Sequence, residues 1–531
     1  MEGGEVVEFA YSVEGPASVE ADLLVLPVFE GPEPGPGVRE LGLLEPYVAA
    51  RLKGKRGEQL LVPRREGDPF RAGAALLVGL GERRGVGADA LRRGMGKAGT
   101  TISRFPTVAT TFPQALGRAA EDAVQATVEG AALGAYRFDR YRTTGEDDGP
   151  PEPPALRRVI VLGSPRWDAR AMRGAVERAE VLAAATAWTR DLVNTPAIDC
   201  TPEHLAQEAR RMAAEAGLEV RVWNERELER AGFGGILGVG RGSVNPPRLI
   251  ELRYRGAGAS EPPLALTGKG IAFDSGGLSL KDAKNMEWMK ADMAGAAAVL
   301  GAMRAIATLK PRVNVIAAIP TAENMPSGSA IRPGDVLRHY GGKTSEVLNT
   351  DAEGRLILAD ALAYLSGQDP RPRAIVDAAT LTGACMVALG EQLWGVMGTD
   401  RALVRELLAA GERAGEPGWE LPLWKEYREQ IRSTIADVKN IGDRWGGAIT
   451  AALFLAEFVG DIPWAHLDIA GPAFAEKPGD LWGRGGTGVP VRTLATWVLE
   501  RAARAPAAGR RAAGRGTAAR PTTRRRASAR R

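Results

Sequence analysis

Residues 264–281 read LALTGKGIAFDSGGLSLK, an apolar run that passes into a glycine-rich polar segment. The first four residues are typical of a buried strand, and the glycines after them allow the chain to bend. Lys269 and Asp274 are five residues apart, so in a straight strand their side chains would point to opposite faces. A bend at the flanking glycines would bring them together. With Lys281 nearby, this loop is a candidate functional site rather than a solvated strand end.

Similar apolar runs recur along the second half of the chain and alternate with helical patterns. Strands are expected at 264–267, 313–319, 374–377 and 465–469, and helices at about 291–309, 356–366 and 448–459. Continuous apolar strands that alternate with helices predict an α/β fold with a mostly parallel sheet covered on both faces. Ligands of such sheets bind at the carboxyl ends of the strands, so the site is expected in the polar segments that follow them.

The octapeptide NTDAEGRL at 349–356 is one such polar segment. If it is extended, Asp351, Glu353 and Arg355 share one face. Two carboxylates about 4 Å apart repel by about 4 kcal/mol at an effective dielectric of about 20, so a buried pair needs cations or a proton. A metal ion would satisfy this need. The octapeptide alone fits a solvated acidic turn equally well.

Three further acids stand near predicted strands or helices. Asp292 lies where the helical pattern 291–309 begins, and its simplest role is an acid in the first helical turn. Glu323 and Asp335 lie in turn-rich segments, where turn and cap roles are the simpler interpretation. None of the three is assigned to a metal by its own local sequence.

The charges of these acids nevertheless match a pair of divalent cations. Four negative charges would come from Asp274, Asp292, Asp351 and Glu353. A neutral lysine amine could complete the ligand set, since a nearby dication favours the deprotonated form. Two ions about 3.5–4 Å apart in one carboxylate cage are a recurrent arrangement for the hydrolysis of amides and phosphates. Such ligands suit Zn²⁺, Mn²⁺, Mg²⁺ or Co²⁺ without ranking them.

Histidines and cysteines offer no alternative metal site. His204, His339 and His466 are scattered without an HExxH pattern, so any metal is expected to be bound mainly by oxygen ligands. Cys200 and Cys385 stand far apart, which indicates small buried residues in a reducing compartment. The acidic start lacks the features of a secretory signal, and no uninterrupted apolar run is long enough to span a bilayer. We therefore expect a cytoplasmic protein without membrane contact.

The length of 531 residues predicts two to four domains, and the composition, 44% hydrophobic and 25% charged, is that of a globular protein. Apolar strands at 23–28, 74–79 and 159–163, with helical stretches between them, predict an N-terminal α/β domain. The expected division is an N-terminal domain at 1–168, a connecting helix at 169–200, a catalytic domain at 201–500 and a disordered tail at 501–531.

The tail is strongly basic. Residues 501–531 hold 11 arginines and no acid, and subtracting them from the net charge of +4 leaves −7 for the rest. Such a tail could neutralise phosphates, which is a nucleic-acid-binding alternative whose affinity would fall steeply with salt. We favour a solubilising extension, because charge blocks are commonly solvated and no aromatic residue is interleaved for stacking.

Six strings together resemble the leucyl (cytosol) aminopeptidases, a family of two-metal exopeptidases. They are NTP at 194–196, GKGIAFDSGG at 268–277, ENMPSG at 323–328, NTDAEGRL at 349–356, TLTGA at 380–384 and WAHLDIAGP at 464–472. The resemblance is collinear from about residue 194 to residue 494. The N-terminal domain agrees with the family only in general pattern, and the tail lies outside it.

The resemblance implies a ligand set for two ions. The tighter metal would be held by Lys269, Asp274, Asp292 and Glu353. The more exchangeable metal would be held by Asp274, Asp351 and Glu353. Asp274 and Glu353 would therefore bridge both ions, which are expected to be Mn²⁺ or Zn²⁺, with Mg²⁺ or Co²⁺ as alternatives.

The resemblance also implies catalytic and substrate-binding residues. Lys281 would stabilise the oxyanion that forms on the peptide carbonyl. Arg355 would hold a bicarbonate ion that acts as a general base toward the metal-activated water. The pocket for the first side chain would be lined by Met289, Thr380 and Gly383, and the backbone of Leu381 would contact the substrate.

The implied activity is removal of leucine and other, mostly apolar, N-terminal residues from peptides by a metal-dependent aminopeptidase. The implied structure is a small macro-like N-terminal α/β domain and a larger catalytic α/β domain, assembled as a homohexamer with active sites facing an interior cavity. The main chemical alternative is a two-metal phosphatase or esterase that uses the same carboxylates.

Overall fold

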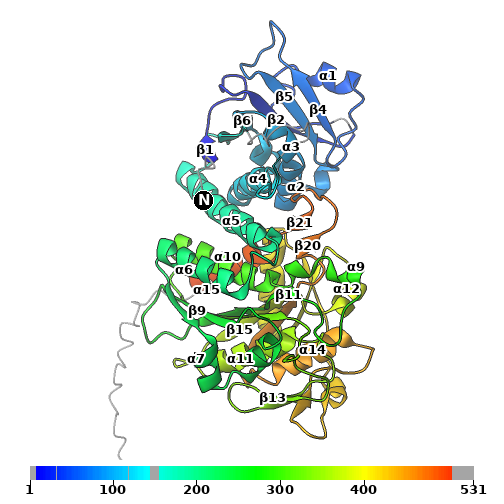
Figure 1. Ribbon diagram of the computed structural model, residues 1–531. Coiled ribbons are helices and arrows are strands. Elements are labelled where there is room, and N and C mark those ends of the chain that lie inside the picture. Colours follow the sequence, from blue (N-terminus) through cyan, green and yellow to red (C-terminus); the bar gives the residue numbers. More distant parts are fainter. Residues whose placement is uncertain (1–6, 32, 118, 144–154, 505–531) are drawn as a thin grey trace, which may run out of the picture.

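A computed structural model shows two domains joined by one long helix (Figure 1). It describes the whole chain except residues 1–6, 32, 118, 144–154 and 505–531. The N-terminal domain is drawn blue to cyan and the catalytic domain green to red. The predicted two-domain α/β organisation is confirmed in the part of the chain that is described.

The N-terminal domain is built on a seven-stranded sheet in the order β1-β7-β6-β2-β5-β4, with β3 paired to β2. Its strands are β1 (Glu8–Ser12), β2 (Leu23–Phe29), β3 (Glu33–Pro34), β4 (Gln59–Pro63), β5 (Ala74–Gly79), β6 (Thr107–Thr110) and β7 (Arg158–Leu162). Its helices are α1 (Leu44–Ala49), η1 (Arg83–Gly85), α2 (Ala88–Lys97), α3 (Gly99–Ile102), η2 (Phe112–Ala115) and α4 (Ala120–Gly134). The central strands β2 and β5 are buried along their whole length, as their continuous apolar sequences predict.

The connector is helix α5 (Ala169–Asn194), which packs against α4 on one side and α10 on the other. It begins at Asp168, whose side chain accepts a hydrogen bond from the Arg170 N–H. The chain then turns into α6 (Pro202–Ala216), which Thr201 caps by accepting from the His204 N–H. Pro202 is the first helical residue, where its missing N–H costs no intrahelical hydrogen bond.

The catalytic domain is built on a nine-stranded sheet in the order β17-β16-β19-β15-β10-β12-β9-β8, with β11 paired to β12. Its strands are β8 (Glu219–Trp223), β9 (Arg248–Arg255), β10 (Leu264–Gly268), β11 (Gly270–Asp274), β12 (Asn314–Asn324), β15 (Ala374–Ala379), β16 (Trp394–Gly398), β17 (Gly418–Glu420) and β19 (Trp464–Asp468). The central strands β19, β15, β10 and β12 are parallel neighbours, whereas β8, β9 and β16 make antiparallel pairs. The prediction of a mostly parallel sheet is confirmed for the part that carries the site.

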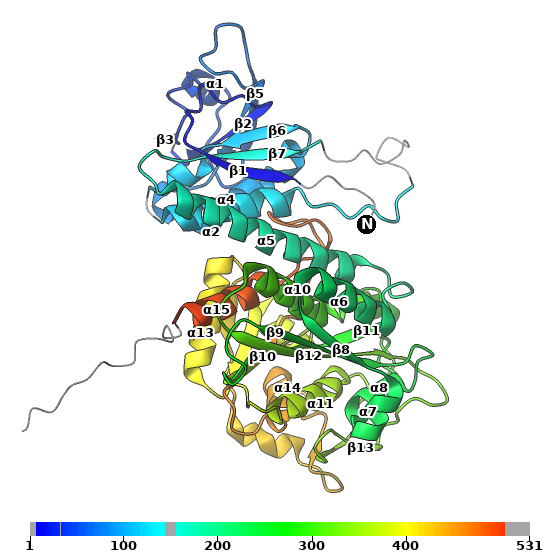
Figure 2. The same cartoon turned by 90° about the vertical axis from the view of Figure 1, so that its left-hand side faces the viewer.

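Helices cover both faces of this sheet (Figure 2). The face toward the N-terminal domain carries α6, α10 (Ala294–Leu309), α13 (Arg401–Ala414) and α15 (Val491–Arg504). The opposite face carries α7 (Glu225–Ala231), α8 (Gly234–Gly240), α11 (Gly354–Ser366) and α14 (Gly447–Ala456). The remaining elements are α9 (Ala283–Met286), η3 (Met289–Ala291), α12 (Gly383–Leu389), η4 (Lys425–Ile431), β13 (Val336–Arg338), β14 (Thr344–Glu346), β18 (Val438–Lys439), β20 (Phe474–Ala475) and β21 (Gly485–Gly486).

One helical stretch, Ala283–Leu309, is long and apolar enough to cross a membrane by length and composition. Its most apolar window is 83% buried within the protein, which is the behaviour of a core helix. The stretch joins α9, η3 and α10 and contains Lys284, Lys290 and Asp292, so it is not an uninterrupted apolar run of the kind that the sequence analysis found to be missing. Cys200 and Cys385 are buried free thiols, as expected.

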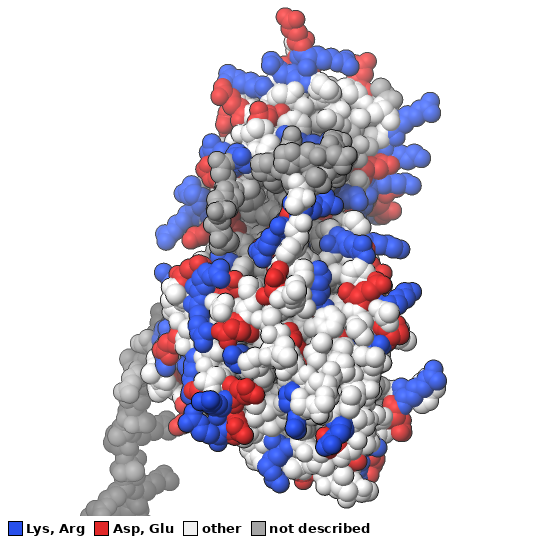
Figure 3. Space-filling view, viewed as in Figure 1, with Lys and Arg blue, Asp and Glu red and all other residues white. Residues whose placement is uncertain are grey.

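The expected end of the catalytic domain, residue 500, lies inside a helix. Helix α15 continues to Arg504, past the expected domain end at residue 500, because Arg501 and Arg504 both pair with Glu406. The rest of the predicted tail lies outside the described residues. On the face shown in Figure 3, basic and acidic side chains are interspersed, so no single-sign patch dominates it.

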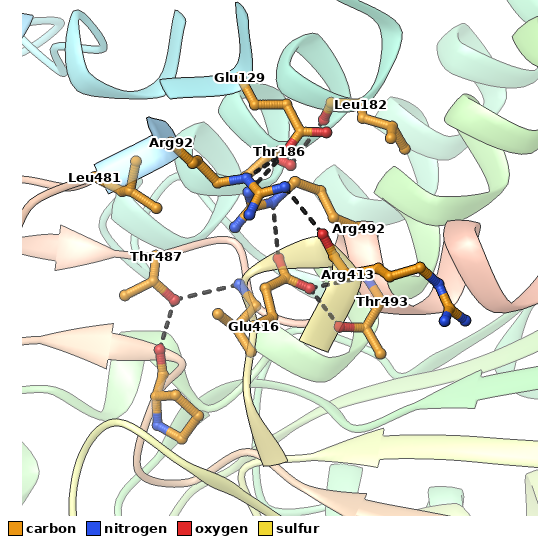
Figure 4. A network of polar contacts seen from close by, with 12 residues as sticks. Arg92, Glu129, Leu182, Thr186, Arg413, Glu416, Leu481, Thr487, Arg492 and Thr493 are labelled. Atoms are coloured by element: carbon orange, nitrogen blue, oxygen red, sulfur yellow. Dashed lines mark hydrogen bonds and ion pairs between the residues drawn. The ribbon is translucent and has the colours of Figure 1, made fainter. Parts of the chain in front are cut away.

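A buried ionic network joins the two domains (Figure 4). Arg92 on α2 lies 2.7 Å from Glu129 on α4, and its Nη2 donates to the Arg413 carbonyl of the catalytic domain at 3.0 Å. From the other side, Arg492 on α15 reaches Glu129 at 3.3 Å and Glu416 at 3.1 Å. All four ionised side chains of this network are almost fully buried, so each depends on the others for its compensating charge.

We expect Glu129→Ala to destabilise the protein by about 3–5 kcal/mol, because it leaves Arg92 and Arg492 buried without their shared counter-charge. Urea titration followed by fluorescence measures the change. Glu121→Ala is the matched control, since Glu121 is an exposed acid on the same helix and should change stability by less than about 1 kcal/mol. Equal effects of the two substitutions would contradict a structural role for the network.

Candidate active site

A break between two strands brings Lys269 and Asp274 into one pocket. Strand β10 lies between β15 and β12, and after Lys269 the chain continues as β11, which pairs with β12 with a shifted register. The side chains of Lys269 and Asp274 are 4% and 2% exposed. The predicted bend at the glycines therefore exists.

Glycine is required where the next element approaches this lysine. A Cβ on Gly354 would lie 2.4–2.7 Å from the Cδ, Cε and Nζ atoms of Lys269. Gly354 is the first residue of α11, so its missing side chain lets the helix end sit directly against the lysine. The sequence GRL at 354–356 thereby fixes how closely the two parts of the site can meet.

Asp292 joins the site from a different position than predicted. It follows η3 and precedes α10, which begins at Ala294, so it is not an acid in the first turn of that helix. Its Oδ1 accepts from the Thr380 hydroxyl at 2.7 Å, and its Oδ2 lies 2.9 Å from Lys269 Nζ. The interaction with Lys269, rather than a helix dipole, accounts for its place.

The octapeptide at 349–356 is not extended. Asp351 lies in a turn, Glu353 is the residue before helix α11 with α-helical dihedral angles, and Arg355 is already inside the helix. The expectation of one shared strand face is therefore wrong. Asp351 and Glu353 nevertheless both lie beside Asp274, the last residue of β11, because the chain turns between Asp351 and the start of α11.

The carboxylates form a compact cage. One oxygen each from Asp274, Asp351 and Glu353 lies within 4.8 Å of the others. Lys269 Nζ is 2.8 Å from Glu353 Oε1 and also donates to the Thr380 carbonyl at 3.0 Å. The five predicted ligands Lys269, Asp274, Asp292, Asp351 and Glu353 are thus brought together.

The cage fits a divalent cation on two observations. Glu353 Oε2 is buried and has no hydrogen-bond partner among the described residues. The donor set is four carboxylates and one primary amine, which suits hard and borderline divalent ions. Buried carboxylate oxygens are costly unless they are paired or bind a metal.

The electrostatics of the cage point the same way. Burial raises the pKa values of the Asp292, Asp351 and Glu353 carboxyls, and the charge of Asp274 raises them further. Burial by itself would lower the pKa of the Lys269 ammonium, but the surrounding carboxylates outweigh this and raise it. The cage therefore holds more negative charge than its lysines neutralise, and it favours added positive charge.

Lys281 closes the more open side of the cage. Its Nζ lies 2.8 Å from Asp274 Oδ2 and 2.5 Å from Asp351 Oδ1, and its side chain is 15% exposed. Burial alone would lower the pKa of this ammonium, but the Asp274 carboxylate more than offsets it, so the pKa is raised. Lys281 is therefore a cation at neutral pH, positioned between the cage and solvent.

Arg355 is buried next to the cage, close to the charges of Glu353 and Asp468. Its Nη1 donates to the Asn440 carbonyl at 2.8 Å, while its buried Nε has no hydrogen-bond partner among the described residues. Burial lowers the pKa of the guanidinium to about 10, against the charges of Glu353 and Asp468, which raise it. Arg355 thus remains charged at neutral pH and keeps an unused donor.

The predicted substrate residues lie on two elements beside the cage. Met289 begins η3, the short helix that leads to Asp292. Thr380 and Leu381 lie between β15 and α12, and Gly383 is the first residue of α12. A Cβ on Gly383 would meet nothing within 4 Å, so this backbone borders open space.

Sequence reasoning missed two residues that hold the ligand loops. Asn324 Nδ2 donates to Asp274 Oδ1 at 2.8 Å and to the Thr350 carbonyl at 2.9 Å. Asn440 Nδ2 donates to the Asn349 carbonyl at 2.7 Å, and its Oδ1 accepts from the Leu348 N–H at 2.9 Å. Asn324 falls within one of the six strings, which was the available signal, whereas Asn440 falls within none.

Glu323 and Asp335 do not join the cage. Glu323 accepts from Ser243 and Asn245, and Asp335 accepts from the backbone and side chain of the nearby Arg332. The local turn role expected for Asp335 is confirmed, whereas the one expected for Glu323 is wrong, because Glu323 is a buried residue of β12 that accepts hydrogen bonds from a segment distant in sequence.

The sequence matches two family profiles. The cytosol aminopeptidase family catalytic domain matches residues 187–495, and the N-terminal domain of the same family matches residues 25–145. The chain belongs to the cytosol aminopeptidase family. It is therefore a metal-dependent aminopeptidase, a peptidase of the hydrolase class.

Curated relatives agree along nearly the whole chain. A probable cytosol aminopeptidase of Syntrophotalea carbinolica is 46% identical over 486 residues, which cover 90% of this chain and 96% of the relative. A probable cytosol aminopeptidase of Rhodococcus opacus is 45% identical over 466 residues, covering 87% and 89%.

Solved structures show the same architecture. A mutant of tomato leucine aminopeptidase superposes with a TM-score of 0.82 at 32% identity, covering 94% of this chain and 98% of that one. The bottromycin maturation enzyme BotP in complex with manganese superposes with a TM-score of 0.79 at 39% identity, covering 91% and 100%. The family's two-domain fold is therefore common to this cytosol aminopeptidase and both structures.

Proposed function

We propose that this aminopeptidase removes leucine and other, mostly apolar, N-terminal residues from peptides with the help of two divalent cations. The observation that carries the proposal is the carboxylate cage of Asp274, Asp351 and Glu353 beside two lysines. The family membership supplies the reaction class, hydrolysis of an N-terminal peptide bond.

Five side chains would hold the ions: Lys269, Asp274, Asp292, Asp351 and Glu353. When bound, the ions would polarise the peptide carbonyl, lower the pKa of a water molecule and accept the free amino group. Lys269 would join as a neutral amine, since nearby dications favour loss of its proton. Mn²⁺ or Zn²⁺ is the proposed pair, with Mg²⁺ or Co²⁺ as alternatives, and the manganese complex of a structural neighbour supports the first.

Lys281 would stabilise the negative charge that develops on the carbonyl oxygen. Its ammonium is held by Asp274 and Asp351 on the exposed side of the cage, where a peptide can reach it. A donor fixed before the reaction needs no reorganisation as charge develops, which is why such groups accelerate acyl transfer strongly.

Arg355 would hold a bicarbonate ion that takes a proton from the attacking water. The buried Nε without a partner supports this role, because it leaves one guanidinium donor for an anion. The Asn440 carbonyl fixes the other end of the guanidinium.

Four residues would receive the N-terminal residue of the peptide: Met289, Thr380, Leu381 and Gly383. The open space beside Gly383 supports a pocket there, and the preceding loop is tied to the cage through Thr380. We further propose a homohexamer in the cytoplasm, on the family's description as cytosol aminopeptidases and on the resemblance of the catalytic sequence.

A pair of substrates tests the function. Purified protein with Mn²⁺ or Zn²⁺ should hydrolyse leucyl anilide to leucine and the free aniline but should not hydrolyse N-acetyl-leucyl anilide, because acetylation removes the free amino group. Equal cleavage of both would indicate an esterase-like or endopeptidase activity instead. A two-metal phosphatase would cleave neither and would hydrolyse an aryl phosphate.

A further inference from the structure

Asp468 is a fully buried aspartate behind the loop proposed to contact the substrate. It is the last residue of β19, and its register partner on β15 is Ala379, the last residue before that loop. Its Oδ1 accepts from the Leu381 N–H at 3.3 Å and the Thr382 N–H at 3.4 Å. Its Oδ2 accepts from the Thr382 hydroxyl at 2.7 Å.

The carboxylate is held by neutral donors. No lysine, arginine or histidine in the described part of the chain forms an ion pair with Asp468, and a third backbone donor comes from the Ala470 N–H at 3.2 Å. A buried charge without a direct ion pair persists only where several hydrogen bonds satisfy it. The N–H groups of Leu381 and Thr382 therefore stabilise the buried Asp468 carboxylate, and the same hydrogen bonds fix the position of the loop.

In all three hydrogen bonds the loop supplies the donor, so Asp468 must accept at both Oδ1 and Oδ2. Thr382 Oγ1 already accepts from the Cys385 N–H at 3.0 Å, as the cap of α12, so its own proton is directed to Asp468. An asparagine at position 468 would present one acceptor oxygen and one amide nitrogen. One side of the loop would then lose its acceptor.

The same loop is tied to the metal cage on its other side. The Thr380 carbonyl accepts from Lys269 Nζ at 3.0 Å, and the Thr380 hydroxyl donates to Asp292 at 2.7 Å. Three consecutive residues are thus fixed between the cage and Asp468. The negative charge of Asp468 also offsets part of the burial cost of the Arg355 guanidinium.

We propose that Asp468 is a positioning residue of the active site, which sets the substrate-contacting backbone of Leu381 at a fixed place relative to the carboxylate cage. The proposal rests on the proposed function for the role of Leu381. Asp468 itself touches neither substrate nor cage.

The test compares Asp468→Asn with Thr382→Val and with the double variant, in the full-length protein loaded with Mn²⁺. Because the loop contributes binding that is equal in ground and transition states, we expect each variant to raise the KM for leucyl anilide about tenfold and change kcat less than about threefold. The inhibition constant of L-leucine should rise in parallel. Thr382→Ser, which keeps the hydroxyl, should restore the KM of the parent.

Asp360→Asn is the matched control. Asp360 is an equally buried aspartate that accepts from the Ile236 N–H at 2.8 Å and the Tyr340 N–H at 2.9 Å, on the far part of α11. It should lower the thermal midpoint as Asp468→Asn does, but leave the KM and the inhibition constant unchanged.

Two outcomes overturn the proposal. One is a KM for Asp468→Asn or Thr382→Val no higher than that of Asp360→Asn. The other is additive effects in the double variant, because residues that act through one hydrogen bond must couple. If Asp468→Asn does not fold, the KM values of Thr382→Val and Thr382→Ser alone test the proposal. Failure of the proposed function is a different result, since the parent protein would then not hydrolyse leucyl anilide at all.

Discussion

Lys281→Ala is expected to lower kcat by about 10²–10³-fold while the metal content stays near that of the parent. The ammonium is fixed between Asp274 and Asp351, and no residue in the described part of the chain is placed to replace it there. Its removal leaves the cage more negative, so binding of cations should not weaken. Steady-state kinetics on leucyl anilide and elemental analysis of the purified variant measure the two quantities.

Lys284→Ala is the control for this prediction, since Lys284 is an exposed lysine three residues further along, on α9. It should keep both activity and metal. A Lys281→Ala variant that loses its metal together with its activity would assign Lys281 to the cage. If the kcat of Lys281→Ala were unchanged, Lys281 would have no role in the reaction.

The catalytic sheet could be predicted from the sequence because its central strands are buried on both faces. Strands β10, β12, β15 and β19 are continuous apolar runs that end in polar residues, and the expected segments match them to within a few residues, apart from the carboxyl-terminal extension of β12 to Asn324. Edge strands lack this signal. Strand β4, for example, alternates exposed and half-buried residues, and its neighbours in sequence gave no reason to place it in the sheet.

The composition of the cage could be predicted, but its geometry could not. The charges of Asp351 and Glu353 made them candidate ligands whatever conformation the backbone adopts, whereas the expected extended conformation was wrong. The helix begins at Gly354 because the apolar residues after it pack on the sheet face formed by β10 and β12. The start of this helix thus depends on packing with strands that lie 30 to 90 residues earlier in the chain, which local spacing does not encode.

The residues that hold the site were the least visible in the sequence. Asn440 and Asp468 act on loops about 90 residues away, and most of their hydrogen bonds there are to backbone atoms, which every sequence has. An asparagine or aspartate at such a position has no partner of matching charge or spacing to reveal it. Only the folded chain shows that Asn440 supports the Asn349–Ala352 turn and that Asp468 supports the loop after β15.

Asp274→Ala is expected to remove bound metal and, with it, almost all aminopeptidase activity. One carboxylate oxygen of Asp274 lies within 4.8 Å of an oxygen of Asp351 and of Glu353. Asp274 is also one of the two residues proposed to hold both ions. The substitution also leaves Asn324 and the Gly276 N–H without their acceptor, which costs about 1–3 kcal/mol for each buried donor. Elemental analysis and activity with excess Mn²⁺ measure the loss.

Asp274→Asn separates the two causes. Asparagine keeps an oxygen for Gly276 but removes the negative charge, so it should fold better than alanine and still bind little metal. Asp335→Ala, an acid in an exposed turn with its own arginine partner, should retain both metal and activity. If Asp274→Asn bound two equivalents of metal, the charge of Asp274 would not be what holds the ions. The cage would then need another source of negative charge, and Glu353, whose buried Oε2 has no hydrogen-bond partner among the described residues, would be the next acid to replace.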